Sequence, residues 1–196
     1  MNKKSLLSML FIIGLTQALP AQAGWNPFAT ESAKKQNIRN PDVAEAITNF
    51  KNKDPKMKVF FSKAYGYAIF PTVGKAGIGI GGAYGTGEVF KKGKLIGTTS
   101  LTQLTIGFQL GGQAYSEIIF FKDKRTLDHF TSGNFEFNAQ ASAVAVTAGA
   151  SADADYNNGV AIFTLAKGGL MYEASVGGQK FSYEAIGRKV PVETAK

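Results

Sequence analysis

Few residues of this chain have the types and spacing that catalysis or metal binding requires. The 196 residues include no cysteine and one histidine, His129, which excludes disulfides, thiolate metal sites, a cysteine nucleophile and multi-histidine metal centres. His129 has no nucleophile at a suitable spacing, so we interpret it as a partly exposed helix residue. Asp153 and Asp155 resemble the start of a calcium loop, but Asn158 and Thr164 stand where an EF-hand needs Gly and Glu. The sequence therefore predicts no catalytic residue, no metal site and no cofactor, and we expect the protein not to be an enzyme.

A glycine-rich stretch is a second candidate for chemistry. Twelve glycines lie within residues 74–112, and Gly77, Gly79 and Gly82 satisfy the GxGxxG pattern of dinucleotide-binding loops. Nucleotide binding would require a helix that begins at the third glycine and presents its N-terminus to the phosphates. Residues 83–90 continue instead as strand, so we reject that interpretation. We expect glycines at alternate positions of a strand, where another backbone or a helix can approach the bare face closely.

The lysines are the third distinctive group. The formal net charge is +8, and residues 24–75 hold nine Lys and Arg against four acidic residues. Residues 76–196 are almost balanced, with eleven basic and ten acidic residues. The positive charge is therefore local, which predicts contact with an anionic partner on this part of the chain.

Two short helices are expected to position most of these lysines. Residues 40–42 have the cap and first-turn proline of a helix start, and apolar residues then recur at helical spacing as far as Phe50. Residues 54–55 begin a second helix, whose apolar stripe starts at Met57 and whose other faces carry lysines. Such a helix can lie in a membrane interface, with lysines at the headgroups and aromatic rings below. Alternatively, the apolar stripe packs on the rest of the domain. The candidate lipid-binding residues are Lys51, Lys53, Lys56, Lys58, Phe60, Phe61, Lys63 and Lys75.

From Tyr65 onward an alternation of apolar and polar residues replaces the helical period and predicts strands. The expected strands are residues 65–73, 104–110, 116–121, 135–154, 160–166, 170–176 and 180–186. Turns are expected at 158–159, 167–169 and 177–178, and one short helix at 123–130. Short connections favour antiparallel neighbours. We therefore expect an α+β fold in which short N-terminal helices pack on a strongly bent antiparallel β-sheet or a barrel-like sandwich.

The first residues have the features of an export signal. Two lysines in Met1–Lys4 precede an apolar run, and Ala21-Gln22-Ala23 provides the small residues that a signal peptidase reads. The alternative, a membrane anchor, is disfavoured because the run is near ten residues and a spanning helix needs about 20. We expect a signal peptide at 1–23, a flexible segment at 24–40, one domain at 41–187 and a polar tail at 188–196. The protein would then be periplasmic or peripherally attached to bacterial envelope membranes.

An ordered set of motifs resembles the SYLF domain family. It consists of YGYAIFP at 65–71, Lys75, the glycines within 77–87, and GFQLGGQA at 107–114. The resemblance extends from about residue 42 to residue 186, although the closing strand departs from the family pattern. It implies a non-catalytic module that recognises anionic lipids. Similar eukaryotic domains bind phosphoinositides and sometimes actin, and these two partners are not carried over to an exported bacterial chain.

The sequence thus predicts anionic phospholipid or a membrane surface as the partner, and no nucleic acid. Two alternatives remain. One is a small outer-membrane β-barrel, since export, alternating strands, tight turns and abundant glycine are also typical of that class. The other is a structural or protein-interaction protein of the cell envelope.

Overall fold

The computed structural model of this chain describes residues 40–133, 135–137 and 144–187, and within residues 171–177 only the backbone is described. The expected signal peptide, all of the flexible segment except residue 40, and the whole polar tail lie outside the described residues. Their boundaries therefore stay predictions.

Both expected N-terminal helices are present. They comprise the α-helix α2 (Pro41–Lys53), the 3-10 helix η1 (Pro55–Met57) and the α-helix α3 (Lys58–Lys63). The Asn40 side chain caps α2 by accepting the backbone N–H of Asp42 at 2.9 Å, and the Asp54 side chain caps η1 by accepting that of Lys56 at 3.0 Å. Local capping chemistry thus determines where these helices begin, as the sequence indicated.

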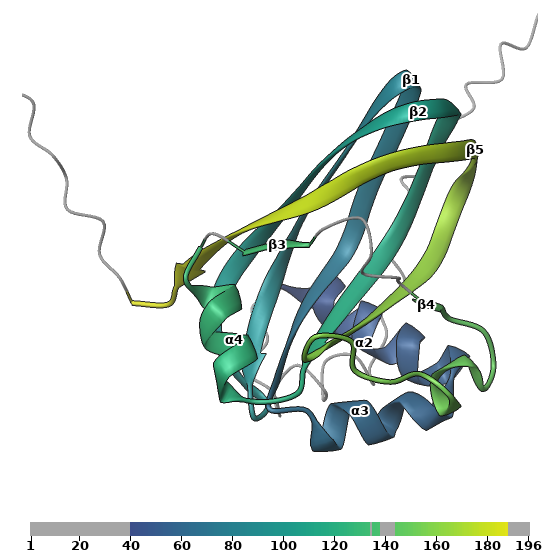
Figure 1. Cartoon of the computed structure of the whole chain (residues 1–196). Coiled ribbons are helices and arrows are strands. Elements are labelled where there is room, and N and C mark those ends of the chain that lie inside the picture. The colour runs from purple at the N-terminus through teal and green to yellow at the C-terminus, as the bar shows by residue number, and fades with distance from the viewer. Residues whose placement is uncertain (1–39, 134, 138–143, 188–196) are drawn as a thin grey trace, which may run out of the picture.

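Three long antiparallel strands form the main sheet, and each of them folds over along its length. These strands are β1 (Gly66–Lys91), β2 (Lys94–Phe121) and β5 (Val160–Ala185), and the sheet order is β1-β2-β5-β3. The short β3 (Phe135–Phe137) pairs antiparallel with β5, and β4 (Val144–Ala145) pairs with it in parallel. Figure 1 shows the long strands arching over at the end of the molecule remote from α2 and α3. The result is a curled mixed sheet of half-barrel form, which confirms the expected α+β class.

The bend divides β1 into two arms that lie against each other. Near the start and end of the strand, the Tyr67 and Phe90 rings stack with centroids 4.8 Å apart. At the bend, Gly79 takes a φ of +69° and the register with β2 shifts between Ile78 and Ile80. A left-handed φ is accessible to glycine without steric cost, so Gly79 permits the chain to reverse within a continuous strand.

Two expectations for the C-terminal half were wrong. Residues 167–169 and 177–178 are not chain reversals, because β5 runs continuously through them and pairs with β2 along its whole length. The register between β2 and β5 shifts between Ala114 and Tyr115, so the first of these segments contains a β-bulge instead of a turn. Within the expected strand at 135–154, residues 138–143 lie outside the described residues; of the remainder, β3 and β4 are strand, and the 3-10 helix η2 (Ala150–Ala152) follows them. The turn at 158–159 is confirmed, with both residues at positive φ.

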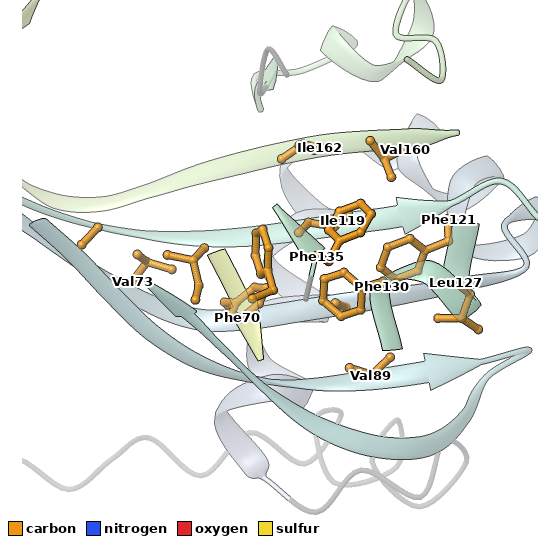
Figure 2. Packing of buried hydrophobic residues seen from close by; sticks show 14 residues of the cluster. Phe70, Val73, Val89, Ile119, Phe121, Leu127, Phe130, Phe135, Val160 and Ile162 are labelled. Atoms are coloured by element: carbon orange, nitrogen blue, oxygen red, sulfur yellow. The ribbon is translucent and has the colours of Figure 1, made fainter. Parts of the chain in front are cut away.

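The core has two parts, one on each side of the first arm. Between the arms, a cluster that includes Phe70, Phe121, Phe130 and Phe181 is closed by the helix α4 (Lys124–Thr131), as Figure 2 shows for most of its members. Beneath α2 and α3, a second cluster includes Phe50, Phe60, Ile69, Phe120 and Phe163. Residues 118–121 of the strand segment 116–121 are apolar on both faces because both faces are covered, and Ser116 and Glu117 before them are buried as well.

Candidate functional site

The helical end of the molecule has a lysine-rich outer surface, here called the lysine face. It consists of the exposed residues Lys53, Lys56, Lys58 and Lys63 on α2, η1 and α3. The ion pairs found among the described residues join Lys124 to Asp128 and Lys180 to Glu136. The positive charge of the lysine face is therefore not neutralised by any carboxylate in the described part of the chain.

The acidic residue that lies between Lys53 and Lys56, Asp54, is turned inward. Its carboxylate is fully buried, and its Oδ2 accepts the backbone N–H of Ser151 at 2.8 Å while its Oδ1 accepts that of Lys56. Burial raises the pKa of Asp54, but the hydrogen bonds from Ser151 and Lys56 outweigh it and leave the pKa lowered. Asp54 thus anchors η2 to the helices and takes no part in the outer surface.

Lys51 and Phe61 occupy the boundary between this surface and the core. The Lys51 Nζ lies 4.4 Å from the centroid of the Phe61 ring, which is a cation–π contact. Burial, and then the neighbouring charge of Lys58, lower the pKa of Lys51. The Phe61 ring also contacts Tyr67 and Phe120 edge-on, at centroid distances of 5.4 and 5.0 Å. Both residues therefore take part in the packing of the helices on the sheet and also border the lysine face.

Phe60, the other aromatic residue expected to contact lipid, is a core residue. Its side chain is 8% exposed, and its ring packs against Phe120, Tyr156 and Phe163 at centroid distances of 4.9 to 5.7 Å. Insertion of this ring into a membrane would require the core beneath α3 to open. The structure therefore assigns Phe60 to packing, which is the alternative that the apolar stripe of α3 left open.

A hollow of about 500 Å³ lies beside the lysine face and is called the basic hollow. Three lysines from separate elements line it: Lys63 of α3, Lys92 of the turn between β1 and β2, and Lys122 after β2. Tyr65 lies on the same wall, and the Nζ atom of Lys92 is 5.4 Å from its ring centroid. None of the described residues that line the hollow is acidic. Lysines that converge beside an aromatic ring can bind an anionic headgroup.

Lys75 does not join the lysine face. It follows Gly66 by nine residues of extended strand, a separation of about 30 Å, and it lies in the first arm of β1 close to the bend. There it lines an open hollow of about 500 Å³ together with Gly82, Tyr84 and Gln103. The structure thus separates the eight candidate residues into seven at the helical end and one near the bend.

The bend has a polar interior built around Gln109, which is 3% exposed. Its Nε2 donates to the carbonyl oxygens of Gly79 and Thr105, both at 3.1 Å, and its Oε1 accepts the Thr105 hydroxyl at 2.8 Å. A Cβ at Gly77 or Gly81 would lie 2.9 or 2.2 Å from Gln109 Oε1. The alternating glycines therefore make room for this side chain and for the return of β1 on itself, which is the close approach expected from the sequence.

The outer surface of the bend is apolar and exposed, and it is called the bend tip. Its members are Ile78, Ile80, Tyr84, Leu104, Ile106, Phe108, Leu110 and Leu170, with exposed fractions between 53% and 83%. On β2 the usual pattern is inverted, because Thr105 and Gln109 are buried while Ile106 and Phe108 face outward. Exposed apolar residues gathered in one patch mark interaction sites more often than isolated ones do.

No catalytic arrangement accompanies these surfaces in the described part of the chain. His129 is exposed on α4, where its ring contacts Phe135 edge-on at 4.8 Å. Across residues 40–133, 135–137 and 144–187, there is no group of three or more His, Asp or Glu placed to hold a metal ion. A polar hollow of about 300 Å³ contains hydroxyl groups and carboxylates, including those of Thr99, Ser182 and Glu88, but no imidazole.

Sequence reasoning missed the basic hollow and the bend tip. Lys92 and Lys122 lie far from the basic segment in sequence, so their convergence with Lys63 depends on the chain fold. The sequence of β2 contained one sign of the bend tip, the alternation of polar and apolar residues over residues 104–110. The structure shows that the polar residues Thr105 and Gln109 are buried and the apolar residues are exposed. Alternation by itself, however, does not say which face of a strand is covered.

The fold and its surfaces define an α+β domain with a curled sheet, a basic helical end and an apolar bend. A family model described as Ysc84, Las17-binding protein actin regulator, matches residues 102–185. The chain is also 31% identical over 156 residues to Beta cell expansion factor A of Aeromonas veronii, an alignment that covers 77% of this chain and 58% of that protein. The chain thus spans less than two thirds of the length of this curated relative.

These similarities place the chain in the SYLF family, which confirms the resemblance seen in its motifs. Members of the family are not known enzymes, and membership supports a lipid-binding or membrane-associated role at most. None of the helices in the described residues is long and apolar enough to cross a membrane.

Proposed function

We propose that this domain binds anionic phospholipid without catalysis, through the lysine face and the basic hollow of its helical end. Lys75 in the glycine-rich strand region would add a separate basic contact. The observation that carries the proposal is the convergence of Lys63, Lys92 and Lys122 from three elements around one hollow whose described lining contains no acidic residue. Family membership supports the same general role.

The expected affinity is modest. A lysine near an anionic membrane surface contributes about 1 kcal/mol, so the lysine face together with Lys92 and Lys122 contributes about 6 kcal/mol at most. That free energy corresponds to a dissociation constant of roughly tens of micromolar. Because exposed charges are screened by salt, binding should weaken as ionic strength rises.

The first prediction tests the basic hollow by removing its charge. We expect the variant Lys63→Gln/Lys92→Gln/Lys122→Gln to bind phosphatidylglycerol vesicles up to about 100-fold more weakly than the unaltered protein, since three lysines contribute about 3 kcal/mol together. Co-sedimentation with phosphatidylglycerol vesicles, and with phosphatidylcholine vesicles as the neutral reference, measures this at several salt concentrations.

A control variant removes the same charge elsewhere. Lys124→Gln/Arg125→Gln/Lys180→Gln alters exposed residues of α4 and β5 and should retain most of the binding. Equal losses in the two triple variants would mean that only net charge matters. Equal binding to anionic and neutral vesicles would contradict the electrostatic proposal as a whole.

We also propose that the protein acts outside the cytoplasm, in the periplasm or peripherally on envelope membranes. The support is the charged, apolar and small-residue order of residues 1–23. Mass spectrometry of the protein isolated from the envelope fraction tests this, since cleavage after Ala23 leaves a chain that begins at Gly24. An intact N-terminus would contradict it.

A further inference from the structure

We propose that the bend tip is a second lipid-contact surface, which inserts its apolar side chains into the interfacial layer of a bilayer. This inference rests on the proposed lipid-binding function and assigns to it a surface remote from the lysines. Figure 1 shows that the bends of β1, β2 and β5 lie together at the end of the sheet opposite α2 and α3.

Large apolar side chains are exposed at the bend. Ile78 is 80% exposed, Phe108 73% and Leu170 83%, and they come from three neighbouring strands of one sheet. Transfer of such side chains from water into a lipid interface is favourable, roughly in proportion to the apolar area removed from water.

The strands that carry these side chains have few charged residues near the bend. Residues 76–87 of β1 and 95–116 of β2 contain no Asp, Glu, Lys, Arg or His. On β5, Glu173 is the single charged residue between Lys167 and Lys180, and it pairs in register with Gln109. A sheet end that remains in water would be expected to carry charged side chains, whereas a charged group in the apolar layer is costly.

Backbone polar groups at the bend also need hydrogen-bond partners. A bend breaks the regular ladder and frees carbonyl groups, which lipid cannot satisfy. Here the Gly79 and Thr105 carbonyl oxygens accept from the buried Gln109 amide. These two carbonyl oxygens are therefore satisfied within the protein, as contact of the bend with an apolar layer requires.

The depth of insertion is limited to the interface. Within the described sheet, β1 is an edge strand with β2 on one side, so its outward backbone groups need headgroups or water. Lys75 immediately precedes the charge-free stretch of β1 and lies four residues before Gly79, about 13 Å along an extended strand. One leaflet contributes about 15 Å of hydrocarbon, so Lys75 would reach the headgroup level when the tip is inserted.

Lipid fits the bend tip better than the other two possible occupants, a second copy of this chain and a segment outside the described residues. The tip is a convex end formed where strands turn over, as Figure 1 shows. A convex, narrow surface can be surrounded by acyl chains, whereas a stable dimer needs a broad complementary area of about 800 Å² on each partner.

A single labelled cysteine tests the proposal directly, because the chain contains no cysteine of its own. An environment-sensitive fluorophore is attached to Phe108→Cys, and phosphatidylglycerol vesicles with quenchers on their acyl chains are added. We expect a blue shift and strong quenching. The matched control is Thr98→Cys, an exposed position on the other part of the same strand, which should show neither.

Two results would overturn the proposal. One is an unchanged Phe108 label on vesicles that demonstrably bind the protein. The other is a label that is already shielded before lipid is added and does not respond to it, which would indicate a second copy or another segment of the chain. Because Phe108 is exposed, its replacement leaves the core intact, and circular dichroism checks this.

A second variant measures the contribution of the tip to binding. Ile106→Ser/Phe108→Ser should lower partition into vesicles about tenfold for each side chain removed, whereas Val59→Ser, at an exposed apolar position on α3, should change it little. Failure of the unaltered protein to bind any vesicle would overturn the proposed function too. If the protein binds vesicles normally but the fluorophore on Phe108→Cys does not respond to them, this inference alone is overturned.

Discussion

At the scale of single residues, Glu117 is the most unusual ionisable group of the core. It is 1% exposed on β2, its Oε2 accepts Gln179 Nε2 at 3.1 Å, and its Oε1 has no hydrogen-bond partner. Burial raises the pKa of Glu117, and the hydrogen bond from Gln179 lowers it by a smaller amount, so that the pKa is about 7. Glu117 pairs in register with Phe70 in the first arm of β1, whereas Gln179 pairs with Gln103, which lies beside the second arm. This hydrogen bond therefore links the two arms.

The pKa of Glu117 leads to a prediction about pH-dependent stability. Between about pH 4.5 and 7 the folded state retains a proton that the unfolded state releases, so the free energy of unfolding should fall as pH rises through this window. The shift corresponds to about 3 kcal/mol. In Glu117→Gln this part of the decline should disappear when urea denaturation at pH 4 is compared with that at pH 8.

Glu184→Gln is the appropriate control, because Glu184 lies on the same sheet but is exposed. It should leave the pH dependence unchanged. An identical pH dependence in Glu117→Gln and in the unaltered protein would show that burial does not hold the proton on Glu117 in the folded state.

At the scale of elements, glycines determine how closely the two arms of β1 approach. A Cβ added at Gly87 would lie 2.2 Å from the carbonyl oxygen of Ile69 in the first arm, and one added at Gly66 would lie 2.5 Å from that of Phe90. The obstructing atoms belong to the backbone, so a rotamer change cannot relieve the clash. The apolar cluster between the arms depends on this close approach.

We therefore predict that Gly87→Ala destabilises the domain by about 1 to 3 kcal/mol, since overpacking forces the arms apart. Gly74→Ala is the matched control, because a Cβ there would meet no atom within 4 Å and should change stability by less than about 0.5 kcal/mol. Chemical denaturation of the two variants measures the difference. Similar values would show that the arms adjust without cost.

At the scale of the whole molecule, the two proposed lipid contacts lie at opposite ends of the sheet. The lysine face and the basic hollow lie at the helical end, and the bend tip lies where the long strands turn over (Figure 1). One end is suited to headgroups and the other to the apolar interface. A single upright domain cannot place both ends on the same flat membrane.

This geometry predicts that the protein links separate anionic vesicles. Turbidity and dynamic light scattering should increase on mixing, and the increase should be lost in Ile106→Ser/Phe108→Ser while binding through the lysine face remains measurable by co-sedimentation. High salt should reverse the clustering because it screens the lysine contact. Clustering that persists in the double variant would contradict a bridging role for the bend tip.

The sequence alone determined the local features of this protein. The starts of α2 and η1 follow from Asn40 and Asp54 with the prolines after them, and the short helix α4 follows from Asp123. These features depend on neighbouring residues, so capping and periodicity suffice to predict them. The family motifs and the strand at 116–121, whose last four residues are apolar, were recognisable for the same reason.

Tertiary structure decided where each predicted surface lies. Phe60 is buried because β2 and β5 place Phe120 and Phe163 beneath α3, and the basic hollow forms because the fold brings together Lys63, Lys92 and Lys122. Strand alternation divides side chains between two faces, and the structure alone shows which face is covered. At the bend the polar face is covered and the apolar face is exposed, since Gln109 fills the space that glycines leave between the arms.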